Sequence, residues 1–293
     1  MENTLLNTNT IKIVGKLIDA KITTGSRKDN GQGYISVDAT VCSVINGVEN
    51  EYKIGFYSNQ TTKEGQMNKL YESYSHIPEL INRKVEIDGE IRENRYFSNN
   101  SGQLVSTQLL SGKFIKGVVE TTADVASFKV GGFLVKTLVE RLNKKGEVYR
   151  YDLAIGQSNY NGSGMNVITL HVNPEDRNII SGIESTYQLG DTVQFDGNLV
   201  FKVETVTVED SNTAFGAPVL RTYTNRQSNF YITSGSHPLT DERAYPQDVI
   251  TSLNNAYKAR DIELQSKGAS KAPAASAEAT VAPTVTKRQT SLI

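Results

Sequence analysis

The chain has 293 residues and a formal net charge of −1, which leaves room for two domains of ordinary size and indicates no strongly charged partner. A single cysteine excludes an internal disulfide, and three scattered histidines exclude a zinc site built from a Cys/His cluster. The N-terminus lacks the features of a signal peptide and no apolar run approaches ~18 residues, so we expect a cytoplasmic protein without a membrane span.

The first part of the chain predicts three consecutive strands. Residues 11–22 form the first, and a polar, glycine-containing loop follows over 23–33. The stretch YISVDATVCSVI (34–45) alternates apolar and polar residues, as a strand with one buried face does. Asn46-Gly47 is a type I′ hairpin signal, so EYKIGFY (51–57) is expected to return as the third strand.

A helix and two more strands follow. Apolar residues recur at helical spacing between 61 and 81. KVEIDGEIREN (84–94) predicts a fourth strand, RYFSNNSGQ (95–103) a polar loop, and LVSTQLLSGKFIKG (104–117) a fifth strand. This order is that of an OB-fold, a five-stranded Greek-key barrel with a helix between strands three and four.

The pattern then repeats. IKIVGKLIDAKI (11–22) aligns with FKVGGFLVKTLV (128–139), and VEIDG (85–89) aligns with VQFDG (193–197) in the same order. The second copy predicts strands at 127–142, 147–158, 165–173, 191–207 and 217–233, with a helix after 173 for which Asn173 is the expected N-cap. We therefore predict a mainly β protein with two tandem OB-fold barrels, and a duplicated β-sandwich without OB connectivity is the alternative.

Four segments follow from this interpretation. Residues 1–118 form the first OB-fold domain and 119–239 the second. Residues 240–268 predict a C-terminal amphipathic helix. The Ala/Pro/Thr-rich segment 269–293 lacks periodicity and is expected to be a disordered tail.

No motif indicates catalysis, so we expect neither an enzyme nor a cofactor. Asp88 and Asp196 look like a repeated carboxylate pair, but each precedes a strand glycine in a different domain, which favours an architectural role. His171 lies on the polar side of its strand, where a partner-facing side chain is expected in preference to a metal ligand. A nuclease would need clustered acids to hold a metal, and none stand at convincing spacing.

OB-fold barrels bind ligands along strands two and three and the loops beside them. Single-stranded nucleic acid needs cations there for its phosphates and flat rings for its bases. Residues 1–118 carry 14 basic and 13 acidic side chains, and residues 119–238 carry 10 and 13, so the first barrel is the expected main binder. The candidate nucleic-acid-binding residues are Arg27, Lys28, Tyr34, Lys53, Tyr57, Arg92, Arg95, Tyr96, Phe97, Arg150, Tyr160, Lys202, Phe215, Arg221 and Tyr223.

The repeated first strand with its glycine, the strand VEIDGEIREN and the segment RENRYF together resemble bacteriophage-type single-stranded DNA-binding proteins built from OB-folds. The resemblance implies sequence-independent coating of single-stranded DNA, with RNA as an alternative ligand, and proteins of replication, recombination or repair as partners. The C-terminal end TKRQTSLI departs from the acidic tail through which bacterial members of this class recruit partners. Two barrels in tandem allow a monomer to act, although the oligomeric state stays open. A structural or adaptor protein of a virion, with barrels that hold protein partners, is the rival interpretation.

Overall fold

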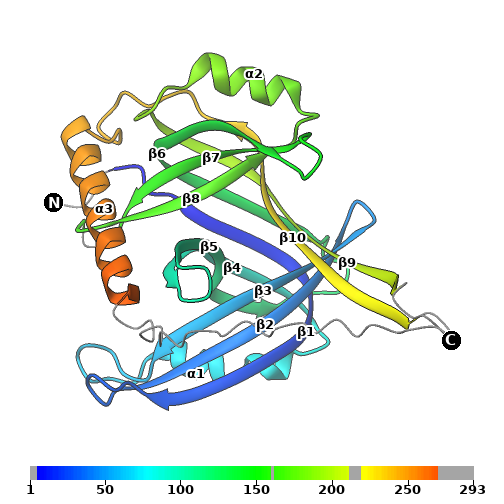
Figure 1. Cartoon of the computed structure of the whole chain (residues 1–293). Helices are drawn as coiled ribbons and strands as arrows, with labels where there is room; N and C mark the ends of the chain where they lie inside the picture. The colour runs from blue at the N-terminus through cyan, green and yellow to red at the C-terminus, as the bar shows by residue number, and fades with distance from the viewer. Residues whose placement is uncertain (1–4, 160–161, 211–218, 270–293) are drawn as a thin grey trace, which may run out of the picture.

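The computed structural model describes residues 5–159, 162–210 and 219–269 (Figure 1). Two β-barrels lie one above the other, and one long helix runs along the side of both. No helix in the described part of the chain has the length and apolar composition that crossing a bilayer requires.

Barrel 1 is formed by the first five strands, with two short helices between the third and the fourth. In chain order its elements are β1 (Asn9–Ser26), β2 (Gly33–Ile45), β3 (Val48–Asn59), α1 (Lys69–Ser75), η1 (Ile77–Leu80), β4 (Lys84–Ser98) and β5 (Gln103–Gly117). β1 pairs antiparallel with β2 and β4, β2 with β3, and β4 with β5. A parallel contact between β3 and β5, at Ile54 and Leu110, closes the barrel.

Barrel 2 repeats this connectivity. Its elements are β6 (Val125–Leu142), β7 (Val148–Ser158), β8 (Met165–Val172), α2 (Arg177–Thr186), β9 (Thr192–Asp210) and β10 (Val219–Gly235). β6 pairs with β7 and β9, β7 with β8, and β9 with β10, while a parallel contact between Tyr231 and His171 closes the barrel. Five strands in OB-fold order, closed in parallel at the equivalent place, confirm two tandem OB-fold barrels and rule out the duplicated sandwich.

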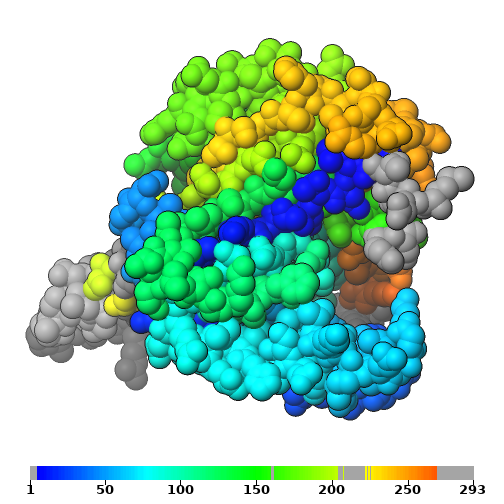
Figure 2. Space-filling model, turned by 180° about the vertical axis from the view of Figure 1, so that it is seen from behind, coloured from blue at the N-terminus to red at the C-terminus, as the bar shows by residue number. Residues whose placement is uncertain are grey.

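The two barrels share a continuous sheet. β1 pairs antiparallel with β6, from Asn9 opposite Val130 to Val14 opposite Val125. β1 is therefore a strand of barrel 1 that also borders barrel 2. Seen from behind, the N-terminal segment runs between the two barrels (Figure 2). The Tyr52 hydroxyl, buried in β3, donates a hydrogen bond of 3.0 Å to the carbonyl oxygen of Leu199 in β9. The barrels are therefore joined by backbone pairing as well as by packing.

The segment 95–98, expected to be a loop, is strand. β4 continues to Ser98 and pairs residue by residue with β5, with Arg95 opposite Ser106 and Phe97 opposite Leu104. The connection is only the short turn at 99–102, in which Gly102 has a φ of 64°, a value that favours glycine. A long β4–β5 hairpin thus extends beyond barrel 1, because the ladder bonds satisfy the backbone of this polar sequence.

The C-terminal side of barrel 2 differs in detail from the sequence-based expectation. Asn173 is not the cap of α2, because its side chain accepts a bond of 3.2 Å from the Glu175 backbone in the turn before the helix. The long helix α3 spans Gln247–Ala269. The expected tail, 269–293, lies outside the described residues except for Ala269.

The glycine of the repeated Asp-Gly marks a close approach between strands. A Cβ on Gly89 would lie 2.2 Å from the Ser111 carbonyl oxygen, and one on Gly197 would lie 2.2 Å from that of Tyr231. The β4–β5 register shifts at Asp88/Gly89, as a bulge requires. The repeated motif is therefore explained by the coiling of two equivalent barrels.

Gly89→Val is expected to destabilise the fold by about 1–3 kcal/mol, the usual cost of overpacking, because the close atom belongs to backbone. Gly55→Val is the matched control, since β3 leaves open space around that glycine. Urea unfolding of both variants measures the difference. Equal unfolding midpoints for the two variants would show that the close approach of the strands does not require glycine at position 89.

Candidate nucleic-acid interface

The outer face of β2 and β3 in barrel 1 is open and carries a pair of stacked tyrosines. The Tyr34 and Tyr57 rings stack with centroids 5.7 Å apart and planes inclined by 26°. Tyr34 lies over Gly25, where a Cβ would be 2.8 Å from its hydroxyl oxygen, and the Tyr57 hydroxyl donates to the Asn59 side chain at 3.2 Å. Tyr57 keeps 48% of its surface exposed. The two rings form a supported flat platform with one side toward solvent.

A groove continues from this platform toward barrel 2. The next outward residues of β3 after Tyr57 are Gly55 and Lys53. They line a depression of about 410 Å³, whose other lining residues include Lys21, Leu109 and the carboxylates of Asp19 and Asp38. Gly55 has nothing within 4 Å of where its Cβ would be, so the floor of the groove is bare backbone. A flat group has room to lie there beside the tyrosine platform.

The groove then crosses onto barrel 2. Lys53 and Leu109 also line a second depression of about 160 Å³, whose opposite wall includes Lys202 of β9 and Arg226 of β10. Arg226 forms an ion pair with Glu51 of β3. Lys53 and Lys202 form no ion pair within the described part of the chain. We call this continuous surface the barrel 1 track, defined by Tyr34, Tyr57, Gly55, Lys53, Lys202 and Arg226.

The loop between β1 and β2 borders the platform with two exposed cations. Arg27 donates two hydrogen bonds to Asp29, at 3.1 and 2.7 Å, and Lys28 lies beside it. The Asp29 carboxylate raises the pKa of Arg27, first through the hydrogen bond and then through its charge. Both cations stand in solvent, where a phosphate can exchange with a surface carboxylate at little cost.

The basic and aromatic residues of β4 are separated by the alternation of the strand. Arg92 and Tyr96 lie on the exposed face, where the Arg92 Nε donates to Glu90 at 2.6 Å. Arg95 and Phe97 lie on the opposite face, toward α3. The expected cluster of four is therefore two pairs on two faces, because a strand directs successive side chains to opposite sides.

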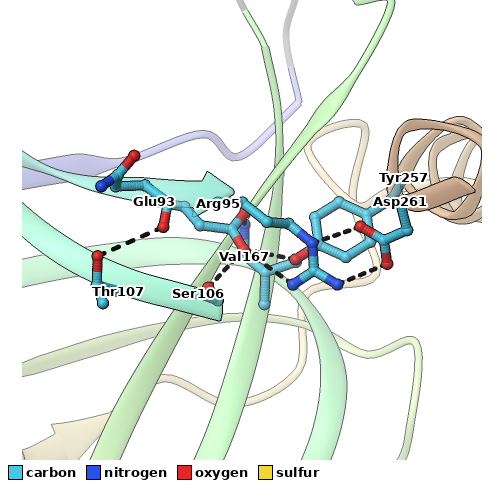
Figure 3. A network of polar contacts seen from close by, with 8 residues as sticks. Glu93, Arg95, Ser106, Thr107, Val167, Tyr257 and Asp261 are labelled. Carbon is cyan, nitrogen blue, oxygen red and sulfur yellow. Dashed lines mark hydrogen bonds and ion pairs between the residues drawn. The ribbon is translucent and has the colours of Figure 1, made fainter. Parts of the chain in front are cut away.

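Arg95 is held by α3 through a polar network (Figure 3). Its guanidinium makes a two-pronged ion pair with Asp261 and lies 4.6 Å from the centroid of the Tyr257 ring. The Tyr257 hydroxyl donates to Glu93, whose carboxylate also accepts bonds from the Ser106 hydroxyl at 2.8 Å and the Val167 backbone at 3.2 Å. No sequence signal points to this contact, since Arg95 and Asp261 are 166 positions apart.

The corresponding face of barrel 2 is covered. Every residue of β7 from Asp152 to Ser158 is buried, whereas β2 and β3 alternate. A Cβ on Gly156 would meet Phe133 and Met165 within 3 Å. These two residues form a second apolar cluster with Tyr245, Ile250 and Leu253. The start of α3 and the residues before it thus fill the surface that in barrel 1 stays open.

The other binding residues that the sequence predicts in barrel 2 either have partners within the fold or have side chains that the structure does not describe. The Arg150 guanidinium donates to Asp152 at 2.8 Å and to the Asn229 side chain at 3.1 Å, so it is partnered within the fold. Tyr160 and Phe215 lie outside the described residues. For Arg221 and Tyr223 only the backbone, in β10, is described.

His171 is buried, which corrects the expectation of a partner-facing side chain. Its Nδ1 accepts a hydrogen bond of 2.9 Å from the Phe230 backbone, and its Nε2 lies 3.8 Å from the Asp152 carboxylate. Burial, followed by the positive charge of Arg150, lowers the pKa of His171 to about 4. This histidine is therefore a neutral part of the barrel 2 structure.

Asp88 and Asp196, although in different barrels, line one depression of about 440 Å³ at the β1–β6 seam, together with Lys12 and Lys129. Lys129 pairs with Asp196 at 3.3 Å, while Lys12 pairs with Glu86 at 3.0 Å. Within the described ranges, no three His, Cys, Asp or Glu side chains gather closely enough to hold a metal ion.

Comparison with solved structures finds similarity to a single-stranded DNA binding protein from Thermus aquaticus. The wild-type protein has 11% sequence identity and a TM-score of 0.49, over 83% of this chain and 98% of that chain. A deletion mutant of the same protein has 13% identity and a TM-score of 0.46 over the same shares. No curated protein matches the chain. The YorF family model matches residues 7–270, nearly the whole described chain, and the protein therefore belongs to the YorF family.

Proposed function

We propose that this protein binds single-stranded DNA without catalysis and with little sequence preference, in replication, recombination or repair. The main support is the stacked Tyr34–Tyr57 pair on an open strand face of an OB-fold, beside a groove whose floor is the backbone of Gly55. Lys53 and Lys202 line the groove farther along, and we expect them to contact phosphates.

The chemistry of the barrel 1 track favours a single strand over a duplex. Tyrosine rings stack on base faces, which are free only where bases are unpaired. Stacking does not read the hydrogen-bonding edges of bases, so affinity is expected to vary little with sequence. RNA offers the same ring faces and phosphates, and it belongs in the experiment as a competitor.

Fluorescence anisotropy with labelled oligo-dT, at low and moderate salt, tests the proposal. The two groove cations, Lys53 and Lys202, are expected to contribute about −1.4 to the slope of log K against log salt, at roughly −0.7 per contact for single strands, and a contact to Arg27 or Lys28 would make the slope steeper. Duplex DNA of the same length and an RNA oligomer serve as competitors. Absence of binding at micromolar protein in low salt would refute the proposal.

Gly55 offers a substitution that fills the track while leaving the fold intact. Gly55→Leu places a side chain in the open space on the groove floor, where the protein itself has no atom within 4 Å. We expect loss of about one base-stacking contact, roughly 5- to 150-fold in affinity, with an unchanged unfolding midpoint. Unaltered affinity would mean that DNA does not pass over β3.

The rival function, a structural or adaptor role, has one observation in its favour. Val48 and Val125, both partly exposed, border a depression of about 430 Å³ between the barrels, whose lining combines apolar residues such as Ile45 and Val200 with polar ones such as Asn46 and Asp124. Exposed valines within a polar rim suit a protein contact. Purified protein with a low 260/280 ratio and stable high-order assembly without nucleic acid would favour this role.

A further inference from the structure

The helix α3 is attached to the two barrels by different kinds of contact. Near its start, Ile250 and Leu253 are buried in the apolar cluster of barrel 2, beside Tyr245, whose ring lies 5.0 Å from that of Phe133. The Tyr245 hydroxyl also accepts a bond of 3.2 Å from the Ser158 backbone. This first half belongs to the core of barrel 2.

The second half of α3, residues 257–268, contacts barrel 1 mainly through polar groups. Asp261 binds Arg95, and Tyr257 binds Glu93. Ile262 is 67% exposed, and the buried end of this half is Gly268, placed against the Phe97 ring. Tyr257 also packs against the apolar cluster of barrel 2, so the residues that bury little apolar surface are those after it. Little apolar burial and contacts made of exchangeable hydrogen bonds are typical of segments that open locally at low free-energy cost.

Opening the second half would leave no buried charge without a partner. The Glu93 side chain is fully buried, but it keeps the Ser106 hydroxyl and the Val167 backbone as donors when Tyr257 departs. The guanidinium of Arg95, 3.5 Å from Glu93, would gain access to solvent. Glu93 and Arg95 of barrel 1 therefore have partners or solvent both when the second half of α3 is docked and when it is released.

The group that α3 presents to Arg95 has the geometry of a phosphate contact. Arg–carboxylate and Arg–phosphate pairs are both two-pronged, with parallel N–H···O bonds. Phe97, two residues farther along the same face of β4, is a flat ring covered by the end of α3. Gln108, which lines the barrel 1 track, is paired with Glu93 across β4 and β5. Arg95 and Phe97 thus lie under the helix, two and four residues along β4 from the position that faces the track residue Gln108.

We propose that the second half of α3 is an internal competitor for single-stranded DNA, in which Asp261 holds Arg95 in place of a phosphate. Its departure extends the barrel 1 track to Arg95 and Phe97, while the first half of the helix stays anchored in barrel 2. This inference rests on the proposed function and concerns the regulation of the same site.

Two charge-matched variants test it. Asp261→Asn and Glu263→Gln each remove one negative charge from α3, but Glu263 lies on the exposed side and pairs with Lys267. We expect Asp261→Asn to bind oligo-dT about 5- to 10-fold more tightly, at the lower end of ordinary coupling between sites. Hydrogen exchange should accelerate over 257–268 and stay slow over 247–254. Glu263→Gln should leave both measurements unchanged.

Two further variants separate competition from structural loosening. Arg95→Ala also frees the helix but removes the cation, so exchange over 257–268 should rise while affinity does not. Tyr257→Phe removes the bond to Glu93 without a change of charge and should act like Asp261→Asn, more weakly. Faster exchange in Asp261→Asn without tighter binding would overturn the inference while the wild-type affinity still supported the proposed function. If neither wild type nor any variant binds DNA, both proposals fail.

Discussion

Replacing Tyr34 and Tyr57 together with alanine is expected to weaken the binding of oligo-dT by roughly 5- to 150-fold. This range follows from about 1–3 kcal/mol per stacked base, and the two rings form one platform because they already stack on each other. Neither ring lies in the apolar core, and Tyr57 interacts only with the side chains of Asn59 and Arg27 among its polar neighbours in the described residues, so the unfolding free energy should change little. Anisotropy titrations at two salt concentrations measure the effect.

Tyr149→Ala is the matched control for this experiment. Tyr149 has the same exposed fraction as Tyr57, 48%, but lies near the start of β7 in barrel 2 and lines neither depression of the barrel 1 track. Its loss should leave affinity unaltered. The salt dependence of the double variant should also match that of wild type, because no cation has been removed. An equal loss of affinity in Tyr149→Ala would show that the Tyr34–Tyr57 pair contributes no more to binding than an exposed tyrosine elsewhere.

Much of the fold could be predicted because local signals and barrel geometry agree. The alternation in 34–45 and 51–57 gave both faces of β2 and β3 correctly, and Asn46-Gly47 adopts positive φ at both residues, as a type I′ turn requires. The repeated Asp-Gly correctly identified β4 and β9 as equivalent strands of the two barrels. The extension of β4 through Arg95 and Phe97 was missed because the face that α3 covers carries charged and aromatic residues, so no alternation of apolar and polar residues marks the strand.

The candidate site was predictable in part, for a physical reason. The outward positions of Lys53 and Tyr57 follow from strand alternation alone, so sequence places them on the open face of barrel 1. Whether a face stays open depends on packing between distant segments. The residues around Tyr245 cover barrel 2, and Asp261 covers Arg95. These contacts are set by the three-dimensional arrangement of two barrels and a helix, which no local pattern encodes.

The fold is expected to lose about 2 kcal/mol of stability between pH 7 and pH 5 through His171 alone. Its pKa in the folded protein is about 4, against an ordinary value of 6.5, because burial disfavours the charged ring. Below pH 6.5 the unfolded chain takes up a proton that the folded chain refuses, so the free energy of unfolding falls. The loss continues to about 3 kcal/mol at pH 4.

His171→Asn isolates this effect, since the asparagine side-chain oxygen can accept the Phe230 N–H in place of Nδ1 but does not titrate. The variant should therefore unfold in urea with nearly the same free energy at pH 7 and pH 5. The carboxylates with lowered pKa values, such as Glu86, act only as the pH falls below their ordinary value of 4.5, outside this interval. His76, whose pKa Glu79 raises, has the opposite sign, and as an exposed pair it contributes little. A wild-type stability that stays constant from pH 7 to pH 5 would contradict a neutral, buried His171.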